Sequence, residues 1–142
     1  MSRTMSASEY AVEQFFRALS DRDISIAPPV LSEEVNLTIP YALAGGTDPE
    51  RVFKRKDAVL GYLGMVLENF TRSVITDRQT FLTDDGRTVF VEGRGDLIRK
   101  SNGEPYRNLY VFRFTISDGH ITDIREYGNP VIYAKALGLQ IG

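Results

Sequence analysis

The sequence predicts one α+β domain over residues 1–142, with helices packed on one face of a curved antiparallel sheet. Apart from one short strand, the first half of the chain has the apolar spacing of helices, and the second half has the alternation of strands. An Asp118-Gly119 dipeptide separates two alternating segments and indicates a β-hairpin, because the favoured two-residue turn needs positive φ. The length of 142 residues suits a single hydrophobic core.

Two helical segments are predicted before the first strand. The first covers residues 6–21 and begins with a capping box, in which the Ser6 side chain accepts from the backbone and Glu9 reaches back. Apolar residues at helical spacing follow, so this helix presents one apolar face. The second segment, residues 24–31, is a short helix or turn that Pro28-Pro29 interrupts.

A strand, a long loop and a third helix are predicted next. Residues 35–39 alternate as a strand, and residues 57–70 carry the apolar face of a helix. Between them, residues 41–52 form the predicted mobile loop, because Gly45-Gly46 is a turn dipeptide and loops of this length are often functional. A basic run that starts at Arg51 is interpreted as a solvated face, since the chain is acidic overall.

The rest of the chain is predicted to form strands and a short closing helix. Residues 73–81 and 88–100 alternate as two strands, the hairpin adds two more, and residues 131–137 form the helix. Gly93 and Gly95 indicate a bulge or a strong bend in the second of these strands, because glycine in a strand interior often marks such a site.

The composition excludes several classes of protein. A net charge of −2 and a pI near 5.4 give no basic surface for nucleic acid or an anionic membrane. The chain has no cysteine and one histidine, His120, which excludes thiolate chemistry and a multi-histidine metal site. No segment has the apolar core of a signal peptide or the length of a membrane span, so we expect a cytoplasmic protein.

Glu126 is the first candidate for chemistry. It shares a strand face with Ile124, across the hairpin from a face that is largely aromatic and also carries an amide: Asn108, Tyr110, Phe112 and Phe114. Apolar neighbours desolvate a carboxyl group and raise its pKa, which suits a general acid or base near neutral pH. The alternative is that Glu126 pairs with an arginine, such as Arg94, Arg113 or Arg125, and stabilises the sheet.

The hairpin and the segment after it also carry a family resemblance. The residues are Asn108, Phe114, Asp118-Gly119, Ile121, Glu126-Tyr127, Asn129-Pro130 and Ala136-Leu137-Gly138. In this combination the chain resembles the SnoaL-like proteins of the NTF2-like superfamily, and within it the phenazine-biosynthesis A/B proteins. The resemblance implies the NTF2-like (cystatin-like) cone fold, with a pocket between the concave face of the sheet and the helices.

The resemblance also implies which residues act in the pocket. The phenazine proteins carry a pocket glutamate, thought to be an acid/base group, at the position of Glu126, and a further glutamate matches Glu92. Two nearby carboxyls would push one pKa upward. Alternatively, Glu92 lies on a solvated strand face and forms charge pairs with its neighbours. Asn108 would orient a substrate carbonyl or hold Glu126, or it is a structural amide at the strand end.

Six further residues are predicted to line the pocket and bind substrate. Tyr110 would supply an apolar wall with one polar group, and the others are Phe112, Tyr41, Tyr62, Phe15 and Ile39. The ketosteroid isomerases of this fold carry an aspartate base, a pocket aspartate and a helix tyrosine, and these positions match Ile39, Tyr110 and Phe15. The chain is therefore not expected to be a typical ketosteroid isomerase. The phenazine proteins also carry a histidine on a helix. The matching position here is near Tyr62, so the chain lacks this histidine.

The resulting expectation is an enzyme that performs acid/base chemistry without a metal or organic cofactor. It would isomerise, cyclise or hydrate a cyclic or polyketide-like, partly apolar substrate, with Glu126 assisted by Asn108 and Glu92. The alternatives are a non-catalytic ligand-binding or carrier domain and, more remotely, a protein-interaction module. Relatives pair through the outer sheet face, which implies a homodimer with an interface near four residues: Arg107, Leu109, Val111 and Arg113.

Overall fold

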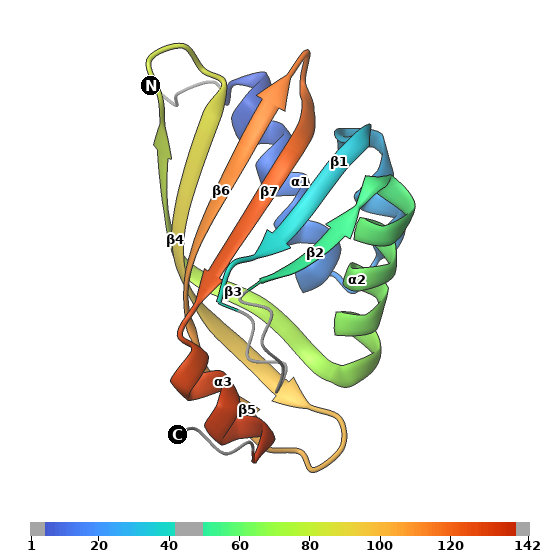
Figure 1. Ribbon diagram of the computed structural model, residues 1–142, viewed down its shortest axis with the longest axis vertical. Coiled ribbons are helices and arrows are strands. Elements are labelled where there is room, and N and C mark those ends of the chain that lie inside the picture. The colour runs from blue at the N-terminus through green and yellow to red at the C-terminus, as the bar shows by residue number, and fades with distance from the viewer. Residues whose placement is uncertain (1–4, 42–49, 139–142) are drawn as a thin grey trace.

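The computed structural model describes residues 5–41 and 50–138 and contains one curved sheet with helices on its concave side (Figure 1). The helical segments are α1 (Ala7–Ser20), η1 (Ile24–Ile26), η2 (Pro28–Val30), α2 (Arg55–Asn69) and α3 (Pro130–Leu137). The strands are β1 (Leu31–Ile39), β2 (Arg51–Lys54), β3 (Phe70–Leu82), β4 (Thr88–Arg99), β5 (Pro105–Tyr106), β6 (Leu109–Ser117) and β7 (His120–Gly128). This architecture confirms the predicted α+β class.

The strand order in the sheet is β2-β1-β7-β6-β4-β3, with β5 paired to β4. All pairs are antiparallel except β1 with β7, which run parallel. The sequence predicts an antiparallel sheet, and the parallel pair departs from it because no hairpin joins these two strands. The whole meander separates them in the chain, so the direction of β1 is set by packing rather than by a turn.

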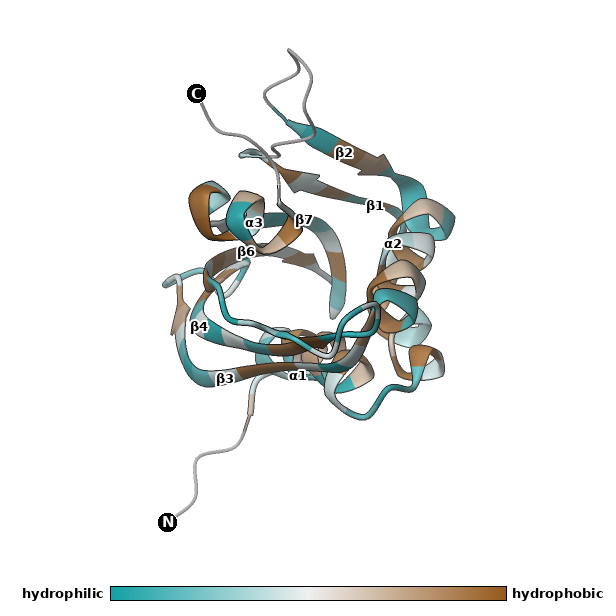
Figure 2. Cartoon of the chain, turned by 90° about the horizontal axis from the view of Figure 1, so that it is seen from below, coloured by the Kyte–Doolittle hydropathy of each residue, from teal (hydrophilic) through white to brown (hydrophobic). Residues whose placement is uncertain are grey.

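The curvature of the sheet creates the enclosed space. Seen from below, the strands curl from β3 and β4 around to β1 and β2, and α2 lies between the two ends (Figure 2). Consistent with this position, α2 contacts both β1 and β3. A bulge strengthens the bend in β3, where two residues between Thr76 and Gln79 oppose Gly93, and Asp77 there has a φ of 53°.

The predicted bulge therefore lies on the neighbouring strand and not at the glycines of β4. Gly93 lies opposite the bulge, and a Cβ at this position would come within 2.5 Å of the Ile75 side chain. Gly95 serves a different purpose, since a Cβ would come within 2.8 Å of the Tyr110 ring. Both glycines permit close packing on the inner face, and β4 itself remains in regular register with β6.

An aromatic cluster closes the narrow part of the cone. The buried face of α1 packs against β6, where the ring centroid of Phe15 lies 5.2 Å from that of Phe114 and Phe16 lies 5.1 Å from Phe112. These edge-on contacts occur because the capping box at Ser6 sets the start of α1 and its apolar positions recur at helical spacing. The cluster anchors α1 to the hairpin strands that carry the candidate site.

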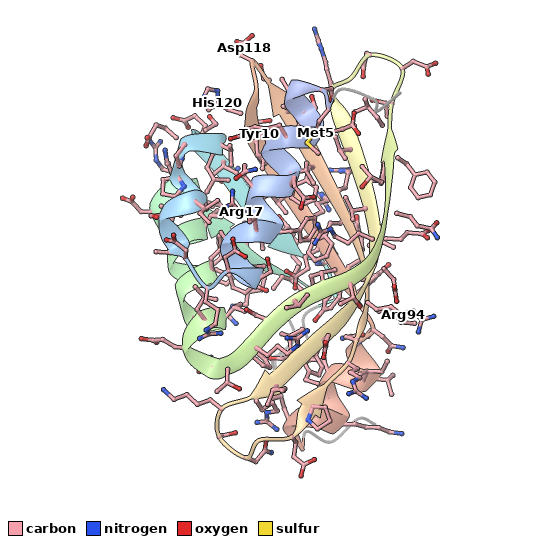
Figure 3. The ribbon with its side chains drawn as sticks, turned by 180° about the vertical axis from the view of Figure 1, so that it is seen from behind. Met5, Tyr10, Arg17, Arg94, Asp118 and His120 are labelled. Atoms are coloured by element: carbon pink, nitrogen blue, oxygen red, sulfur yellow. The ribbon has the colours of Figure 1, made fainter. Side chains whose placement is uncertain are left out.

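The hairpin itself has the predicted geometry. Asp118 and Gly119 adopt φ values of 51° and 75°, as the turn requires. Asp118 and His120 project from the tip of the hairpin (Figure 3), and His120 is exposed as expected. The ladder brings Phe112 opposite Glu126, so the candidate carboxyl lies on the same face as the aromatic residues of β6.

The sequence does not predict two of the short strands, β2 and β5. β2 lies in the segment predicted as loop and basic run, and only Val52 and Phe53 of its four residues are apolar. Its pairing with β1, rather than its own composition, makes it a strand. β5 has two residues and is too short to alternate. The turn dipeptide Gly45-Gly46 of the predicted loop lies outside the described residues.

Candidate functional site

A cavity of about 500 Å³ lies between the concave face of the sheet and the helices. Its walls are mostly aliphatic and aromatic, with contributions from α1, α2, α3 and most of the strands. The charged side chains among its described lining residues are Arg51, Arg99 and Glu126. A cavity of this size and composition suits a small organic ligand.

Glu126 projects from β7 into this cavity. The alternation of β7 places it on the inner face with the fully buried Ile124. Tyr62 reaches it from α2 and its hydroxyl lies 3.0 Å from both carboxyl oxygens, Oε1 and Oε2. This shared hydrogen bond holds the carboxyl in one orientation, because a single donor addresses both oxygens.

Burial raises the pKa of Glu126 from 4.5 to about 7, while the hydrogen bond from Tyr62 partly opposes the rise by stabilising the charged form. No ion pair between described residues includes Glu126. Arg113, one of the partners considered for it, lies 3.6 Å from Asp123 on the opposite face of the sheet. The carboxyl is therefore held by a neutral phenol and not by an arginine of the described chain.

Three tyrosines supply hydroxyl groups near this carboxyl. Burial raises the pKa values of Tyr62, Tyr106 and Tyr110 above the usual range, and the charge of Glu126 raises them further. All three phenols consequently remain protonated at neutral pH and act as hydrogen-bond donors. Gly95 and Gly128 hold the Tyr110 ring in place, since a Cβ at either position would contact it.

Asn108 lines the cavity, but its amide is fully engaged with the protein. Its Nδ2 donates to the Tyr106 hydroxyl at 2.7 Å and to the Asn129 carbonyl at 3.1 Å. Its Oδ1 accepts from the backbone N–H groups of Leu109 and Asn129. The two donors and two acceptor sites of the amide are thus occupied. This geometry favours the structural alternative, in which Asn108 ties the start of β6 to the β7–α3 junction.

Glu92 does not join Glu126 in the cavity, which corrects the expectation that two carboxyls share it. Glu92 is exposed and pairs in register with the exposed Val111 on the convex face of the sheet. Arg94, two residues along on the same face, projects away from the ribbon in Figure 3. The inner face of β4 instead carries its buried valines and glycines together with Leu97.

The predicted substrate-binding residues all lie along the cavity. They come from α1, β1, α2, β6 and the segment after β1: Phe15, Ile39, Tyr41, Tyr62, Tyr110 and Phe112. Tyr41 is 60% exposed and its ring lies 5.9 Å from that of Tyr127, so it borders the opening rather than the interior. The three positions matched to ketosteroid isomerase residues, Phe15, Ile39 and Tyr110, all line the cavity.

Sequence reasoning missed two cationic residues and two tyrosines among the described residues of the cavity. Arg51 was assigned to a solvated basic run, and the pairing of β2 with β1 brings it to the cavity instead. Arg99 donates to the carbonyl of Ala136 near the end of α3. The missed tyrosines are Tyr106, on the unpredicted strand β5, and Tyr133, on α3. The alternation of residues 88–100 offered a signal for Arg99, since it shares a face with the apolar Leu97 and Val91.

The described residues contain neither a candidate metal cluster nor a candidate membrane-spanning helix. Within residues 5–41 and 50–138, no three His, Asp or Glu side chains gather as they would around a metal ion. None of the helices in these ranges combines the length and the apolar character needed to cross a membrane.

The dependence of stability on pH follows from the raised pKa of Glu126. The folded state binds a proton at this site more tightly than the unfolded state, so stability falls as pH rises from about 4.5 to about 7. The loss is at most roughly 3 kcal/mol, from about 1.4 kcal/mol for each pKa unit. We expect urea unfolding to show this loss in the wild type and its absence in Glu126→Gln. Equal pH dependence of the two proteins would contradict the raised pKa.

The fold is a cone-shaped α+β domain, and its cavity lies between the sheet and the helices. Glu126 lies in this cavity among aromatic residues. The chain belongs to the family of SnoaL-like domains, whose model matches residues 12–124. This match confirms the predicted resemblance to the SnoaL-like proteins.

The chain is also similar to individual proteins, in sequence to one and in fold to two others. The chain is 26% identical over 127 residues to the uncharacterised protein YesE of Bacillus subtilis (strain 168), covering 89% of this chain and 84% of YesE. A phenazine biosynthesis-related protein of Pseudomonas aeruginosa has a similar structure, with a TM-score of 0.76 and 20% identity over 96% of this chain and 90% of that one. TerC, crystallised with polyporic acid, has a TM-score of 0.77 and 17% identity over 94% and 99% of the two chains.

Proposed function

We propose that the protein binds a cyclic or polyketide-like, partly apolar molecule in its cavity and transfers protons to and from it through Glu126. The reaction would be an isomerisation, cyclisation or hydration that needs no cofactor. One observation carries the proposal: a buried carboxyl with a pKa of about 7 lies in an aromatic cavity and forms no ion pair within the described chain. The crystallisation of the structurally similar TerC with polyporic acid supports a small-molecule ligand.

The proposed chemistry assigns a separate role to each polar group. The Glu126 carboxylate takes a proton from a carbon next to a carbonyl. The electron pair of the broken C–H bond forms a carbon–carbon double bond, and the π pair of the carbonyl moves to its oxygen. The buried Tyr110 hydroxyl donates a hydrogen bond to the oxygen that gains charge. Glu126, now protonated, returns the proton to another atom of the ligand. A pKa near 7 suits both steps, because the two forms of the carboxyl are then populated at neutral pH.

Two residues support Glu126 without contacting the ligand carbon. Tyr62 donates to both carboxyl oxygens and orients them. Asn108 acts as a positioning residue, because its amide fixes Tyr106 and the Asn129 backbone. Glu92 has no part in this proposal, since it lies on the convex face.

A non-catalytic binding or carrier domain is the second candidate. Ile39 and Phe15 line the cavity at the positions that match catalytic residues of the ketosteroid isomerases. Neither side chain can transfer a proton, and this favours a carrier. Such a domain would hold its ligand in the same cavity, and Glu126 would be a hydrogen-bonding group rather than a base.

Hydrogen exchange separates the two candidates. Enolisable ketones with aromatic rings, such as α-tetralone, β-tetralone and benzoylacetone, are incubated with the protein in deuterated buffer, and deuterium uptake at carbon is followed by NMR. Catalysis predicts uptake faster than with heat-unfolded protein, with an optimum near neutral pH. Ligands that bind in the cavity and exchange at the background rate would favour the carrier.

We also propose that the protein forms a homodimer through the convex face of the sheet. Leu109 and Val111 are exposed there on β6, and Phe90 of β4 and Phe81 of β3 extend the apolar surface. Exposed apolar surface of this kind is commonly covered by a partner. We expect native mass spectrometry at micromolar concentration to show the mass of a dimer and Val111→Glu to give a monomer. A monomeric wild type would overturn this proposal.

A further inference from the structure

Arg51 lies in the same row of the sheet as Glu126. β1 runs parallel to β7 with Thr38 beside Arg125, so the next residue, Ile39, lies beside Glu126. Ile39 in turn pairs with Arg51 on β2. Directly paired residues project to the same side, and both Ile39 and Arg51 line the cavity. Two strand spacings therefore separate the backbones at Arg51 and Glu126, which is about 10 Å.

Aromatic contacts fix the position of the Arg51 side chain. Its guanidinium carbon lies 4.8 Å from the ring centroid of Phe53, and this ring lies 4.7 Å from the ring of Tyr62. Tyr62 is also the residue that donates to Glu126. A chain of contacts thus runs from the cation at the rim of the cavity to the carboxyl inside it. Stacking on an aromatic face leaves the N–H edge of a guanidinium available to an acceptor.

The other arginines of this region have protein partners. Arg99, the second cation of the cavity, donates to the Ala136 carbonyl at the end of α3. Arg55, which follows β2, lies 3.3 Å from the Glu34 carboxylate. Arg51 has no ion pair with any residue in the described part of the chain. Its N–H groups therefore remain free of acidic partners there.

The charge of the cavity is opposite to that of the protein. The chain carries a formal net charge of −2, whereas the described cavity residues include two arginines and one carboxyl. When Glu126 is protonated, the cavity is cationic, and when it is ionised the cavity still has one excess positive charge. Such a site favours a ligand that carries negative charge.

We propose that Arg51 is a specificity-determining residue that recognises a carboxylate on the ligand. The carboxylate binds the guanidinium at the rim, the apolar body of the ligand lies along Ile39 and Tyr62, and the reacting atom lies at Glu126. The backbones at Arg51 and Glu126 lie about 10 Å apart, which is the scale of a ligand with two fused rings and one carboxylate. The inference rests on the proposed function only in that the ligand occupies this cavity, and it adds the substrate class: an aromatic or polyketide-like acid.

A matched pair of probes tests the inference by calorimetry. Naphthoate carries the carboxylate, and naphthamide has nearly the same shape without the charge. We expect the wild type to bind naphthoate about tenfold more tightly than naphthamide, as a hydrogen-bonded charge pair at a partly exposed site would give. The preference should weaken with added salt, because Arg51 is exposed.

The variants assign the preference to one side chain. Arg51→Gln should bind both probes with the affinity that the wild type shows for naphthamide. Arg55→Gln is the control, because Arg55 lies in the same basic run, forms its ion pair elsewhere and does not line the cavity. It should keep the full preference. Thermal unfolding of both variants checks that the fold is unchanged.

The outcomes separate this inference from the proposed function. Equal affinity of the wild type for the two probes, no binding of naphthoate at millimolar concentration, or a preference that survives in Arg51→Gln would each overturn the role of Arg51. The ketone exchange assay can still succeed in those cases, because it uses neutral ligands. Conversely, a carboxylate preference lost in Arg51→Gln supports the inference even if no ketone exchanges.

Discussion

Replacing Glu126 with glutamine should lower the rate of protein-catalysed deuterium exchange by a factor of about 10² to 10⁴. The substitution keeps the size of the side chain and can still accept from Tyr62, but an amide cannot accept a proton from carbon near neutral pH. Burial raises the pKa values of the nearby phenols of Tyr62, Tyr106 and Tyr110, so none of these three groups replaces the lost base. NMR measurement of the exchange rate of a bound ketone, wild type against variant, gives the ratio directly.

Glu92→Gln provides the matched control. Glu92 is also a strand glutamate, but it is exposed on the convex face, so its replacement should leave the exchange rate within about twofold. The Glu126→Gln protein should also be more stable than the wild type above pH 7, since it no longer buries an ionised carboxyl. Loss of activity together with a gain in stability would separate a functional role from damage to the fold. Undiminished exchange in Glu126→Gln would remove Glu126 from the mechanism.

The hairpin shows how far alternation carries a prediction. The sequence predicts the Asp118-Gly119 turn, but a register shift between Thr115 and Ile116 separates this turn from the pairing that brings Phe112 opposite Glu126. Alternation predicts that Glu126 shares a face with Ile124, but an unbroken register from the turn would pair Phe112 with Arg125. The register shift, which the sequence does not announce, is what places Glu126 on the aromatic face. Alternation also leaves open the partner of the carboxyl, since Tyr62 comes from α2, far away in the chain.

Glu92 shows the limit of the same reasoning. The strand over 88–100 has one face with charged residues and one with valines and glycines, and the charged face was considered for the cavity. The glycine face is the inner one, because Gly95 makes room for the Tyr110 ring and Gly93 for Ile75. The signal was present in the sequence, since small residues indicate close packing, but the resemblance to proteins with a second glutamate favoured the other face.

Arg51 was missed for a different physical reason. β2 has four residues and its composition matches a solvated segment, so its strand structure depends on the edge that β1 offers. No local pattern in the sequence specifies that pairing, and the direction of β1 itself depends on the parallel contact with β7. Residues positioned by two successive long-range pairings are therefore the ones that sequence reasoning places least well.

Replacing Asn108 with alanine should lower the free energy of unfolding by about 4 kcal/mol, from four hydrogen bonds at about 1 kcal/mol each. The bonds connect the start of β6, the Tyr106 hydroxyl and the backbone at Asn129, so their loss affects three elements at once. Urea unfolding at constant pH measures the change. Asn102→Ala is the control, because Asn102 lies in an exposed turn and makes one hydrogen bond to its own loop, at Glu104.

The location of the damage tests the role of Asn108 further. Asn129 caps α3 through its side chain, which accepts from the N–H groups of Val131 and Ile132, and Asn108 holds the Asn129 backbone in place. Without Asn108, α3 should open locally, and amide hydrogen exchange in α3 should accelerate more than in α1. Because Tyr133 of α3 lines the cavity, the same variant should bind naphthoate more weakly. A stability loss below about 1 kcal/mol, or protection unchanged in α3, would show that the amide is not the structural tie inferred from its four bonds.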